Sequence, residues 1–559
     1  MPLDVAAFAP YRLAPGAPPE EVARIAAALA DAPLVAPAAA PPPAAIANRA
    51  LADVACGRAA SPEEGCRAAD GSPAGLSGPP RACLSSARQQ ARIAAAAGDA
   101  FRAGFGGVFL DRPDAALALG LLGAGFCDEC LAAFGRQLAR EYGAHFQPLD
   151  YLAMARETVT VSSGALAYGQ LPFGRDFWRF RAGALDDALR AYVRGARDAA
   201  RAGPTPFEVV AQFEALGPGQ LRAARHLDGA IFPGPEVPGA GVGHFRLLRA
   251  VMKRRPVAIA PPGGATPAPP ALLARLAAVG ATCGVEVSGL EPAGAAGDDV
   301  AAIRKLGRQL AAEGRPPAFG APVAECCVVY SADADLWTNG RHRLSVARAG
   351  EALAALHLQA PVVTRVQDAP AEAALVLADA DALSSGEAKE IERRLQAGAA
   401  VLAFGEPGLV DEGGRPAGAF LPSGKPGGVK VGSGTLAVLP SLTPEKGSPA
   451  PVAPAALTKA LAALLGRGRR AAGVSGRSPL LAVMHRSGET LDVHLVTLGA
   501  ERAQGLTLFL ASDLAGGVRR GRFLSSDGSD VVIRLNPSGY QLSTVLPSFQ
   551  GYAVLTLAT

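Results

Sequence analysis

Residues 107–142, GVFLDRPDAALALGLLGAGFCDECLAAFGRQLAREY, join a short apolar run to a long helical stretch. The apolar run, Gly107–Asp111, is continuous rather than alternating, which is typical of a strand buried on both faces of a parallel sheet. The second part, Cys127–Tyr142, has the length and periodicity of a helix. A strand followed by a helix is the repeating unit of an α/β fold.

The same alternation continues on both sides of this unit, over residues 1–320. The strand candidates are Val5–Ala9, Leu34–Ala36, Gly107–Asp111, Glu208–Phe213, Gly229–Pro233, Pro256–Ala260 and Cys283–Val287. The helix candidates around them are Pro19–Ala30, Ser86–Ala103, Cys127–Tyr142, Arg175–Ala202 and Asp299–Gly314. This pattern predicts a (β/α)8 TIM barrel over residues 1–320, with the eighth strand expected in the irregular region 45–85.

Two further domains are expected after the barrel. Residues 321–470 alternate strands and helices again, which predicts a doubly wound α/β domain. Its parallel sheet should contain Cys326–Tyr330, Ala374–Leu377 and Ala400–Phe404. Residues 471–559 change to short strands separated by turn residues, which predicts a small C-terminal antiparallel β-sandwich.

Composition excludes several classes of function. The 559 residues are 49% hydrophobic and 19% charged, with a net charge of +4. This balance lacks the basic excess of a nucleic-acid-binding protein. The sequence contains no run of 18 apolar residues that would predict a membrane span. From the charge balance and this absence we expect neither a nucleic-acid nor a membrane partner. The first residues lack a basic and then apolar leader, so we expect a cytoplasmic protein.

Acidic residues end or follow several strands of the predicted barrel. They are Asp111, Glu214, Glu286 and, in a loop just after a strand, Glu236. Because a barrel brings the carboxyl ends of its strands to one rim, two of these carboxylates could face one cleft as acid and nucleophile. The alternative is that the acids cap helices or pair with Arg112 and Arg225.

Cysteines form the second chemical pattern. Cys127 and Cys130 make a Cys-x-x-Cys pair at the start of a helix, and Cys83 precedes Cys127 by 44 residues. Thiolates at this spacing can hold a structural zinc ion, with Cys56, Cys66 or a histidine as fourth ligand. The alternative is that these cysteines are ordinary core residues, because free cysteine is often buried.

Three segments resemble glycoside hydrolase barrels related to the family 42 β-galactosidases. They are Arg81-Ala-Cys83-Leu-Ser-Ser, Gly107-Val-Phe-Leu-Asp111, and the Cys127-x-x-Cys130 helix that ends in Tyr142-Gly. In that family such a helix follows a barrel strand, and its cysteines bind zinc. The segment Asp176-Phe-Trp-Arg-Phe180 is similar to the family's Trp-x-x-Phe helix.

The resemblance extends to the second and third domains. The stretch from Cys326 to Glu406 is similar to the family's trimerisation domain, a class I amidotransferase-like fold without its nucleophile. Here Ser384-Ser385 stands near the place where an amidotransferase carries its cysteine, so we expect a catalytically silent domain and a homo-oligomer. One departure concerns the acid/base Glu, which follows an Asn in the family, whereas Glu214 follows Gln212-Phe213.

These observations predict hydrolysis of a glycosidic bond in a carbohydrate substrate. Glu214 is the expected general acid/base, and Asp111 or Glu286 is the expected nucleophile of a retaining reaction. The residues expected to bind substrate are Glu236, Arg112 and Trp178. The alternative for Trp178 is a packing role in the core, although aromatic rings also line sugar sites. The alternative function is non-catalytic carbohydrate binding or assembly on a degenerate glycosidase scaffold. A third class, an amidotransferase-type enzyme, is disfavoured by the missing cysteine.

Overall fold

The structure is a computed structural model of the whole chain. It describes residues 11–13, 18, 20, 34–38, 50–61, 64–75, 80–143, 147, 149–161, 171–201, 206–235, 241–253, 255–260, 269–288, 295–313, 320–411, 416–417, 429–443, 454–464, 470–476, 478–499 and 501–558. The chain divides into two compact units. Unit 1 comprises Met1–Pro233 and Arg255–Ala260, and unit 2 comprises Gly234–Arg254 and Pro261–Thr559.

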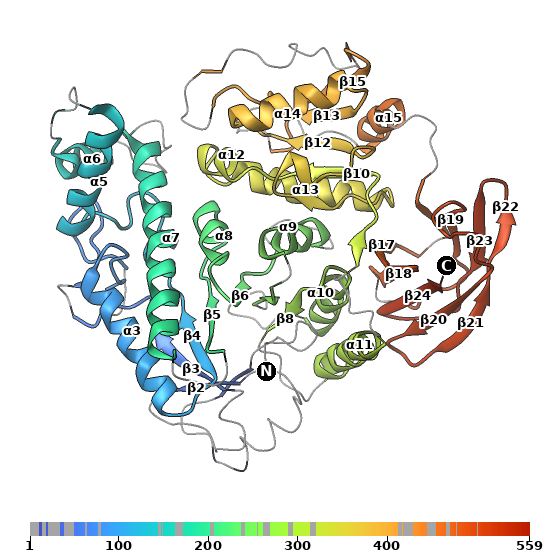
Figure 1. Cartoon of the computed structure of the whole chain (residues 1–559), viewed down its shortest axis with the longest axis horizontal. Helices are drawn as coiled ribbons and strands as arrows, with labels where there is room; N and C mark the ends of the chain where they lie inside the picture. The colour runs from blue at the N-terminus through green and yellow to red at the C-terminus, as the bar shows by residue number, and fades with distance from the viewer. Residues whose placement is uncertain are drawn as a thin grey trace. The chain divides into compact units, whose positions relative to one another are not determined.

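A sheet of eight strands in sequence order confirms the predicted TIM-barrel class (Figure 1). Unit 1 supplies β1 (Tyr11–Arg12), β2 (Leu34–Pro37), β3 (Ala50–Ala55), β4 (Gly107–Asp111), β5 (Glu208–Gln212), β6 (Gly229–Phe232) and β7 (Val257–Ile259), and unit 2 supplies β8 (Glu286–Val287). Each strand from β1 to β6 pairs in parallel with the next.

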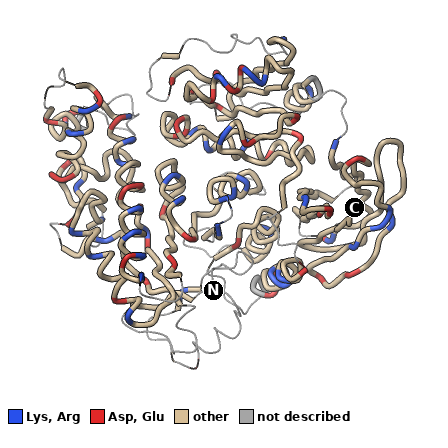
Figure 2. Tube along the Cα trace, viewed as in Figure 1, with Lys and Arg blue, Asp and Glu red and all other residues tan. Residues whose placement is uncertain are grey.

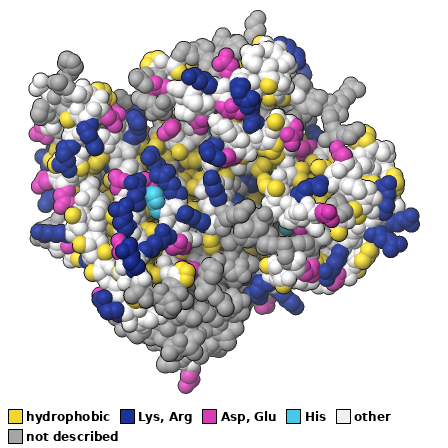
Figure 3. Space-filling view, viewed as in Figure 1, with side chains coloured by type: hydrophobic (Ala, Val, Ile, Leu, Met, Phe, Trp, Pro, Cys, Tyr) yellow, Lys and Arg dark blue, Asp and Glu magenta, His cyan; other side chains and the backbone are white. Residues whose placement is uncertain are grey.

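Helices stand between these strands in unit 1. They are α3 (Ala87–Arg102), α4 (Ala115–Ala118), α5 (Asp128–Tyr142), α6 (Tyr151–Val161), α7 (Gly174–Ala199) and α8 (Pro218–Ala224). The 26-residue α7 buries an apolar stripe that includes Phe177, Leu185 and Leu189. Arg181 is buried with this stripe, whereas Arg190 and Arg197 are largely exposed. Figure 3 shows Lys and Arg side chains gathered over α7 and α8.

The first strand of the barrel differs from the sequence prediction, whereas an additional strand lies where it was expected. The first strand is Tyr11–Arg12, while the expected strand Val5–Ala9 and most of the expected helix Pro19–Ala30 lie outside the described residues. The additional strand β3 lies in the region 45–85, as expected. Its sequence, ALADVA, has weak intrinsic strand preference, and pairing with β2 and β4 on both sides holds it.

The barrel strands share one apolar interior. Each strand from β2 to β7 contributes one side chain to it, and these are Val35, Leu51, Phe109, Val210, Ile231 and Ala258. Since alternate residues of a barrel strand point inward, this layer fills the space between the strands with side chains. It forms the floor beneath the carboxyl ends of β3, β4 and β5.

Unit 2 contains the predicted doubly wound sheet. Its order is β11 (Val362–Val363), β10 (Cys326–Val329), β12 (Ala374–Ala378), β13 (Ala400–Phe404), β15 (Gly434–Leu439) and β14 (Val429–Val431). Neighbours from β11 to β15 are parallel, and β14 is antiparallel. The helices of unit 2 before and within this sheet are α9 (Val242–Met252), α10 (Pro270–Cys283), α11 (Ala295–Ala312), α12 (Ala332–Trp337), α13 (Arg341–Ala355), α14 (Ser385–Gln396) and α15 (Pro454–Leu464).

Two antiparallel sheets near the C-terminus confirm the expected sandwich. One contains β16 (Ala472–Ser475), β19 (Thr507–Ala511), β23 (Gln541–Val545) and β22 (Asn536–Ser538). The other contains β21 (Asp530–Arg534), β20 (Arg520–Ser525), β24 (Tyr552–Ala558), β18 (Thr490–Thr497), β17 (Leu480–Ser487) and β9 (Ala321–Pro322). Buried apolar residues such as Leu495, Leu508 and Phe523 form their shared core.

One finding bears on the remaining expectations. Among the described residues, none of the helices combines the length and apolarity that a bilayer crossing requires. The domain boundaries at residues 320 and 470 stay predictions.

Candidate functional site

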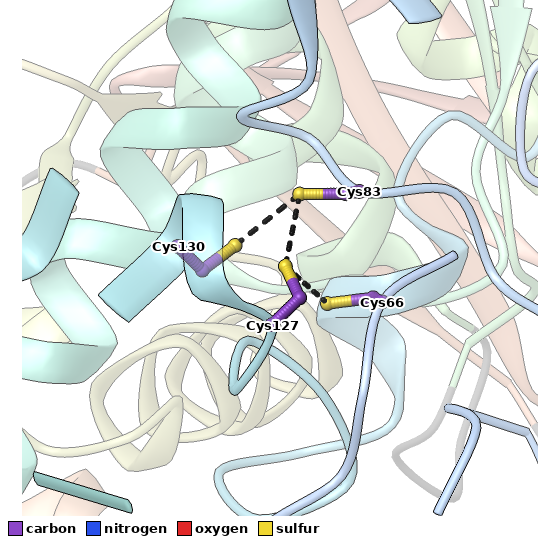
Figure 4. Close-up of side chains that lie close together, drawn as sticks. All are labelled: Cys66, Cys83, Cys127 and Cys130. Carbon is purple, nitrogen blue, oxygen red and sulfur yellow. Dashed lines mark hydrogen bonds between the residues drawn. The ribbon is translucent and has the colours of Figure 1, made fainter. Parts of the chain in front are cut away.

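Four cysteines of unit 1 lie together, and all of their sulfur atoms are within 4.8 Å of one another. Figure 4 shows Cys66, Cys83, Cys127 and Cys130 with their side chains converging on one point. The Sγ–Sγ distances are 3.3 Å from Cys83 to Cys127, 3.4 Å from Cys83 to Cys130 and 4.0 Å from Cys66 to Cys127. Cys127 is half-buried and the other three are buried.

Backbone hydrogen bonds bring the first two cysteines side by side. The N–H of Cys66 donates to the carbonyl of Arg81 at 2.8 Å, and the N–H of Cys83 donates to the carbonyl of Glu64 at 3.1 Å. These bonds tie the segments around residues 66 and 83 into one irregular loop between β3 and α3. The loop therefore presents two thiols on one side.

The helix α5 supplies the other two thiols. Cys127 is its N-cap residue and Cys130 lies in its first turn, so both side chains point to the same end of the helix. The backbone N–H of Gly125 donates to Cys66 Sγ at 3.0 Å, which connects the approach to α5 with the loop. In metal sites the ligand atoms commonly form hydrogen bonds of this kind with the groups that surround them.

The spacing and chemistry of the four sulfurs fit a tetrahedral thiophilic ion. Zinc–sulfur bonds of ~2.3 Å place the sulfurs of a tetrahedron ~3.8 Å apart, and the observed distances lie on both sides of that value. Hydrogen bonds from the neighbouring thiols lower the pKa of Cys66. The hydrogen bond to Cys127 and burial raise the pKa of Cys83. Because four anions cannot share this space alone, a cation would stabilise the fully ionised set.

Sequence reasoning identified three of these residues and left the fourth open. The structure brings in Cys66, while Cys56 is buried and lies outside the cluster. The side chain of Gln89 donates to the carbonyl of Cys56 at 2.9 Å, and burial raises the pKa of the Cys56 thiol. Both cysteines precede Cys83 in the same irregular region, so spacing alone could not distinguish them.

The carboxyl ends of β3 and β4 carry a second cluster, made of charges. Asp111 ends β4, and its carboxylate lies 3.3 Å from Arg12 and 3.4 Å from Arg112. Arg12 also lies 3.3 Å from Asp53 of β3, and burial raises the pKa of Asp53. Arg112 has a φ of 50°, a left-handed conformation that is strained for a residue other than glycine. Such strain is concentrated at functional sites.

Glu214 follows β5, next to this cluster in the sheet. Strand pairing sets Asp111 opposite Gln212, and the N–H of Arg112 donates to the carbonyl of Gln212 at 2.9 Å. Glu214 is therefore at the same edge of the sheet as Asp111. Its carboxylate forms an ion pair of 3.2 Å with Arg81, two residues before Cys83.

A buried carboxylate that the sequence analysis missed holds the backbone at Glu214. Asp114 accepts hydrogen bonds from the N–H of Glu214 at 2.8 Å, from the N–H of Ala215 at 3.1 Å and from Gln220 Nε2 at 3.0 Å. Burial raises the pKa of Asp114 to about 6. The short segment Asp111-Arg112-Pro113-Asp114 thus places one acid at the rim and another beneath it. The sequence signal that could have identified Asp114 is its position three residues after Asp111, the last residue of β4.

The other predicted site residues fall in different places. Glu286 lies half-buried on β8 of unit 2, and Glu236 lies outside the described residues. Trp178 is buried in α7, where Cζ of Arg181 lies 5.7 Å from the centre of its ring. The roles assigned to these three residues stay predictions.

Comparisons with known proteins show the fold. No family model and no curated protein matches the chain. A β-galactosidase from Bacillus circulans sp. alkalophilus matches with a TM-score of 0.65 and 12% identity, over 99% of this chain and 95% of that chain. The catalytic mutant of a GH42 β-galactosidase from G. stearothermophilus matches with a TM-score of 0.64 and 11% identity, over 99% and 94%.

A third similar structure is an enzyme with a different named activity. α-L-Fucosidase isoenzyme 2 from Paenibacillus thiaminolyticus matches with a TM-score of 0.59 and 13% identity, over 91% of this chain and 87% of that chain. The chain therefore has the architecture of the GH42 β-galactosidases along nearly its whole length, at a sequence identity that establishes the fold alone.

Proposed function

We propose that this chain, which has a glycoside hydrolase fold, hydrolyses a glycosidic bond with Asp111 and Glu214. The observation that carries the proposal is the placement of these two carboxylates at the carboxyl ends of adjacent strands β4 and β5. In a TIM barrel this edge is where catalytic groups gather. The solved structures with the same fold are named as glycosidases, which supports a carbohydrate substrate.

Each carboxylate has a role that its surroundings support. Asp111 lies beside two guanidinium groups, which stabilise its negative charge and suit a nucleophile that attacks the anomeric carbon. Glu214 would protonate the departing glycosidic oxygen and later take a proton from the water that releases the glycosyl group from Asp111. Glu286 remains the alternative nucleophile.

A second candidate function is carbohydrate binding without turnover. It is favoured by the ion pairs at the rim, because Asp53, Asp111 and Glu214 each contact an arginine. Arg81 must move from Glu214 before that carboxyl group can donate a proton to a leaving group. A rim whose acids are neutralised in this way could instead bind sugar hydroxyls through its paired charges.

Hydrolysis of a panel of aryl glycosides by the full-length protein tests the two functions. We expect turnover of at least one glycoside, and we expect Glu214→Gln to lower its rate by about 100-fold or more. Asp99→Asn, a change at an exposed acid of α3, is the matched control and should leave the rate unchanged. Saturable sugar binding without turnover of any glycoside would favour the binding function, and full activity of Glu214→Gln would overturn the assignment.

We also propose that Cys66, Cys83, Cys127 and Cys130 hold a structural zinc ion. When bound, zinc would neutralise the thiolates and connect the loop between β3 and α3 to the start of α5. The same loop carries Arg81, which contacts Glu214, so the metal centre would fix one side of the proposed active site. The closed set of four thiols indicates a structural ion rather than a catalytic one.

A further inference from the structure

Unit 2 contains a cavity of about 540 Å³, a size typical of small-molecule sites. Its walls come from α9 and the residue after it, the end of α10, and the strands β9, β11 and β17. All of its lining residues belong to unit 2, whereas Asp111 and Glu214 belong to unit 1. The function of this cavity is therefore a separate question from that of the carboxylate rim.

Positive charge dominates the lining. Arg246 and Arg249 lie three residues apart on α9, and Lys253 follows the helix. The helix α9 carries no acidic residue, as Figure 2 shows by its colours. Among the described residues that line the cavity, Asp368 is the one carboxylate, and it already pairs with Arg365 at 2.5 Å.

Arg246 is the residue that points to a ligand. The residue is 8% exposed, and its Nη1 donates to the carbonyl of Ala360 at 2.9 Å. Glu351 attracts it electrostatically, but the Glu351 carboxylate accepts the N–H of Gly243 at 3.1 Å, and no ion pair joins these two described residues. Buried charges are costly without a partner of opposite sign, so this guanidinium has an open capacity for an anion.

The remaining walls are largely aliphatic, with Gln359 and Thr364 as polar members. Val323, Val363 and Met484 line the cavity, and none of the described lining residues is Phe, Tyr or Trp. Burial lowers the pKa of His485 to about 4, and His485 Nε2 lies 2.8 Å from the carbonyl of Thr282, so this ring adds no charge near neutral pH. A wall without aromatic rings does not suit the stacking of a sugar ring, whereas it suits an aliphatic chain.

We propose that this cavity binds a small amphiphilic carboxylate, with the carboxylate group on Arg246 and an aliphatic body against the apolar wall. Arginine forms paired hydrogen bonds to carboxylates, and Arg249 and Lys253 add charge at the same side. The binding is independent of glycoside hydrolysis.

Titration calorimetry of the full-length protein with sodium octanoate tests the proposal. We expect saturable binding of octanoate. Octanamide should bind at least about tenfold more weakly, because it lacks the negative charge. Arg246→Met should weaken octanoate binding by about tenfold or more. Arg348→Met is the matched control, because Arg348 also donates to a backbone carbonyl, that of Leu442 at 2.7 Å, and does not line the cavity.

A second variant covers the case in which Arg246→Met does not fold. Ala250 lines the cavity on α9, so Ala250→Leu should fill part of the space and abolish octanoate binding while Arg246 stays in place. Equal binding of octanoate and octanamide would overturn the role of charge. Equal binding of inorganic phosphate and octanoate would overturn the amphiphilic class. Octanoate binding that survives both Arg246→Met and Ala250→Leu, or no octanoate binding at all, would overturn the site.

Discussion

Cys66 is the residue on which the zinc proposal depends most directly. Replacing it by serine removes one of four ligands, and we expect purified Cys66→Ser to hold less than about half of the zinc of the native protein, because a three-thiolate set binds more weakly. Cys56→Ser is the control, since Cys56 is buried in the same region but lies outside the cluster. Elemental analysis of both variants measures the difference. Native protein without zinc would contradict the proposal.

Asp114 predicts a pH dependence of stability. Its folded-state pKa is raised to about 6 from an ordinary value of 3.8, so the folded chain binds this proton more tightly than the unfolded chain. The resulting stabilisation is complete below pH 3.8 and is lost as the pH rises to about 6.

The comparison of native protein with Asp114→Asn isolates this contribution. The free energy of unfolding of the native protein, relative to the variant, should fall as the pH rises from about 4 to about 6. Denaturant titrations of both proteins at several pH values measure it. Parallel pH profiles would mean that the proton on Asp114 does not contribute.

The helix α14 begins with a capping box, which gives Ser384 a structural role. Ser384 Oγ accepts the N–H of Glu387 at 3.2 Å, and the Glu387 carboxylate accepts the N–H of Ser384 at 2.9 Å. We expect Ser384→Ala to destabilise the first turn by about 1 kcal/mol, equivalent to about fivefold faster amide exchange there. Hydrogen–deuterium exchange of this segment measures the effect.

Glu387→Gln is the control for that prediction, because glutamine also completes a capping box. It should leave exchange in the first turn of α14 close to native. If Ser384→Ala exchanged at the native rate while abolishing an enzymatic activity, Ser384 would be a reactive residue rather than a cap.

Self-association is the expectation for the intact chain. The sheet of β10, β12 and β13 belongs to the α/β domain whose sequence was expected to resemble a trimerisation domain, and we propose that this domain joins copies of the chain. Sedimentation of the full-length protein should therefore show an oligomer at micromolar concentration. A monomer under these conditions would assign the domain a packing role instead.

Local patterns in the sequence were sufficient for most of the architecture. Continuous apolar runs identified β4, β6 and β10 because strands buried on both faces are formed mainly by apolar residues. The Cys127-x-x-Cys130 pair and Cys83 were recognisable as candidate ligands because their spacing is typical of zinc sites. Strands such as β20 and β23 are harder to identify from the sequence, because their polar residues break the apolar alternation that a half-buried strand normally shows.

Contacts between distant segments determined the rest. Arg81 and Glu214 are 133 residues apart, and neither sequence neighbourhood indicates that they form an ion pair. The choice of Cys66 over Cys56, the burial of Asp114 and the cavity around Arg246 likewise depend on which loops and helices meet. Burial and pairing are properties of the assembled chain, because the cost of an unpaired charge arises only after folding removes its water. The sequence therefore supplied the reactive groups and their strands, while folding fixed their partners.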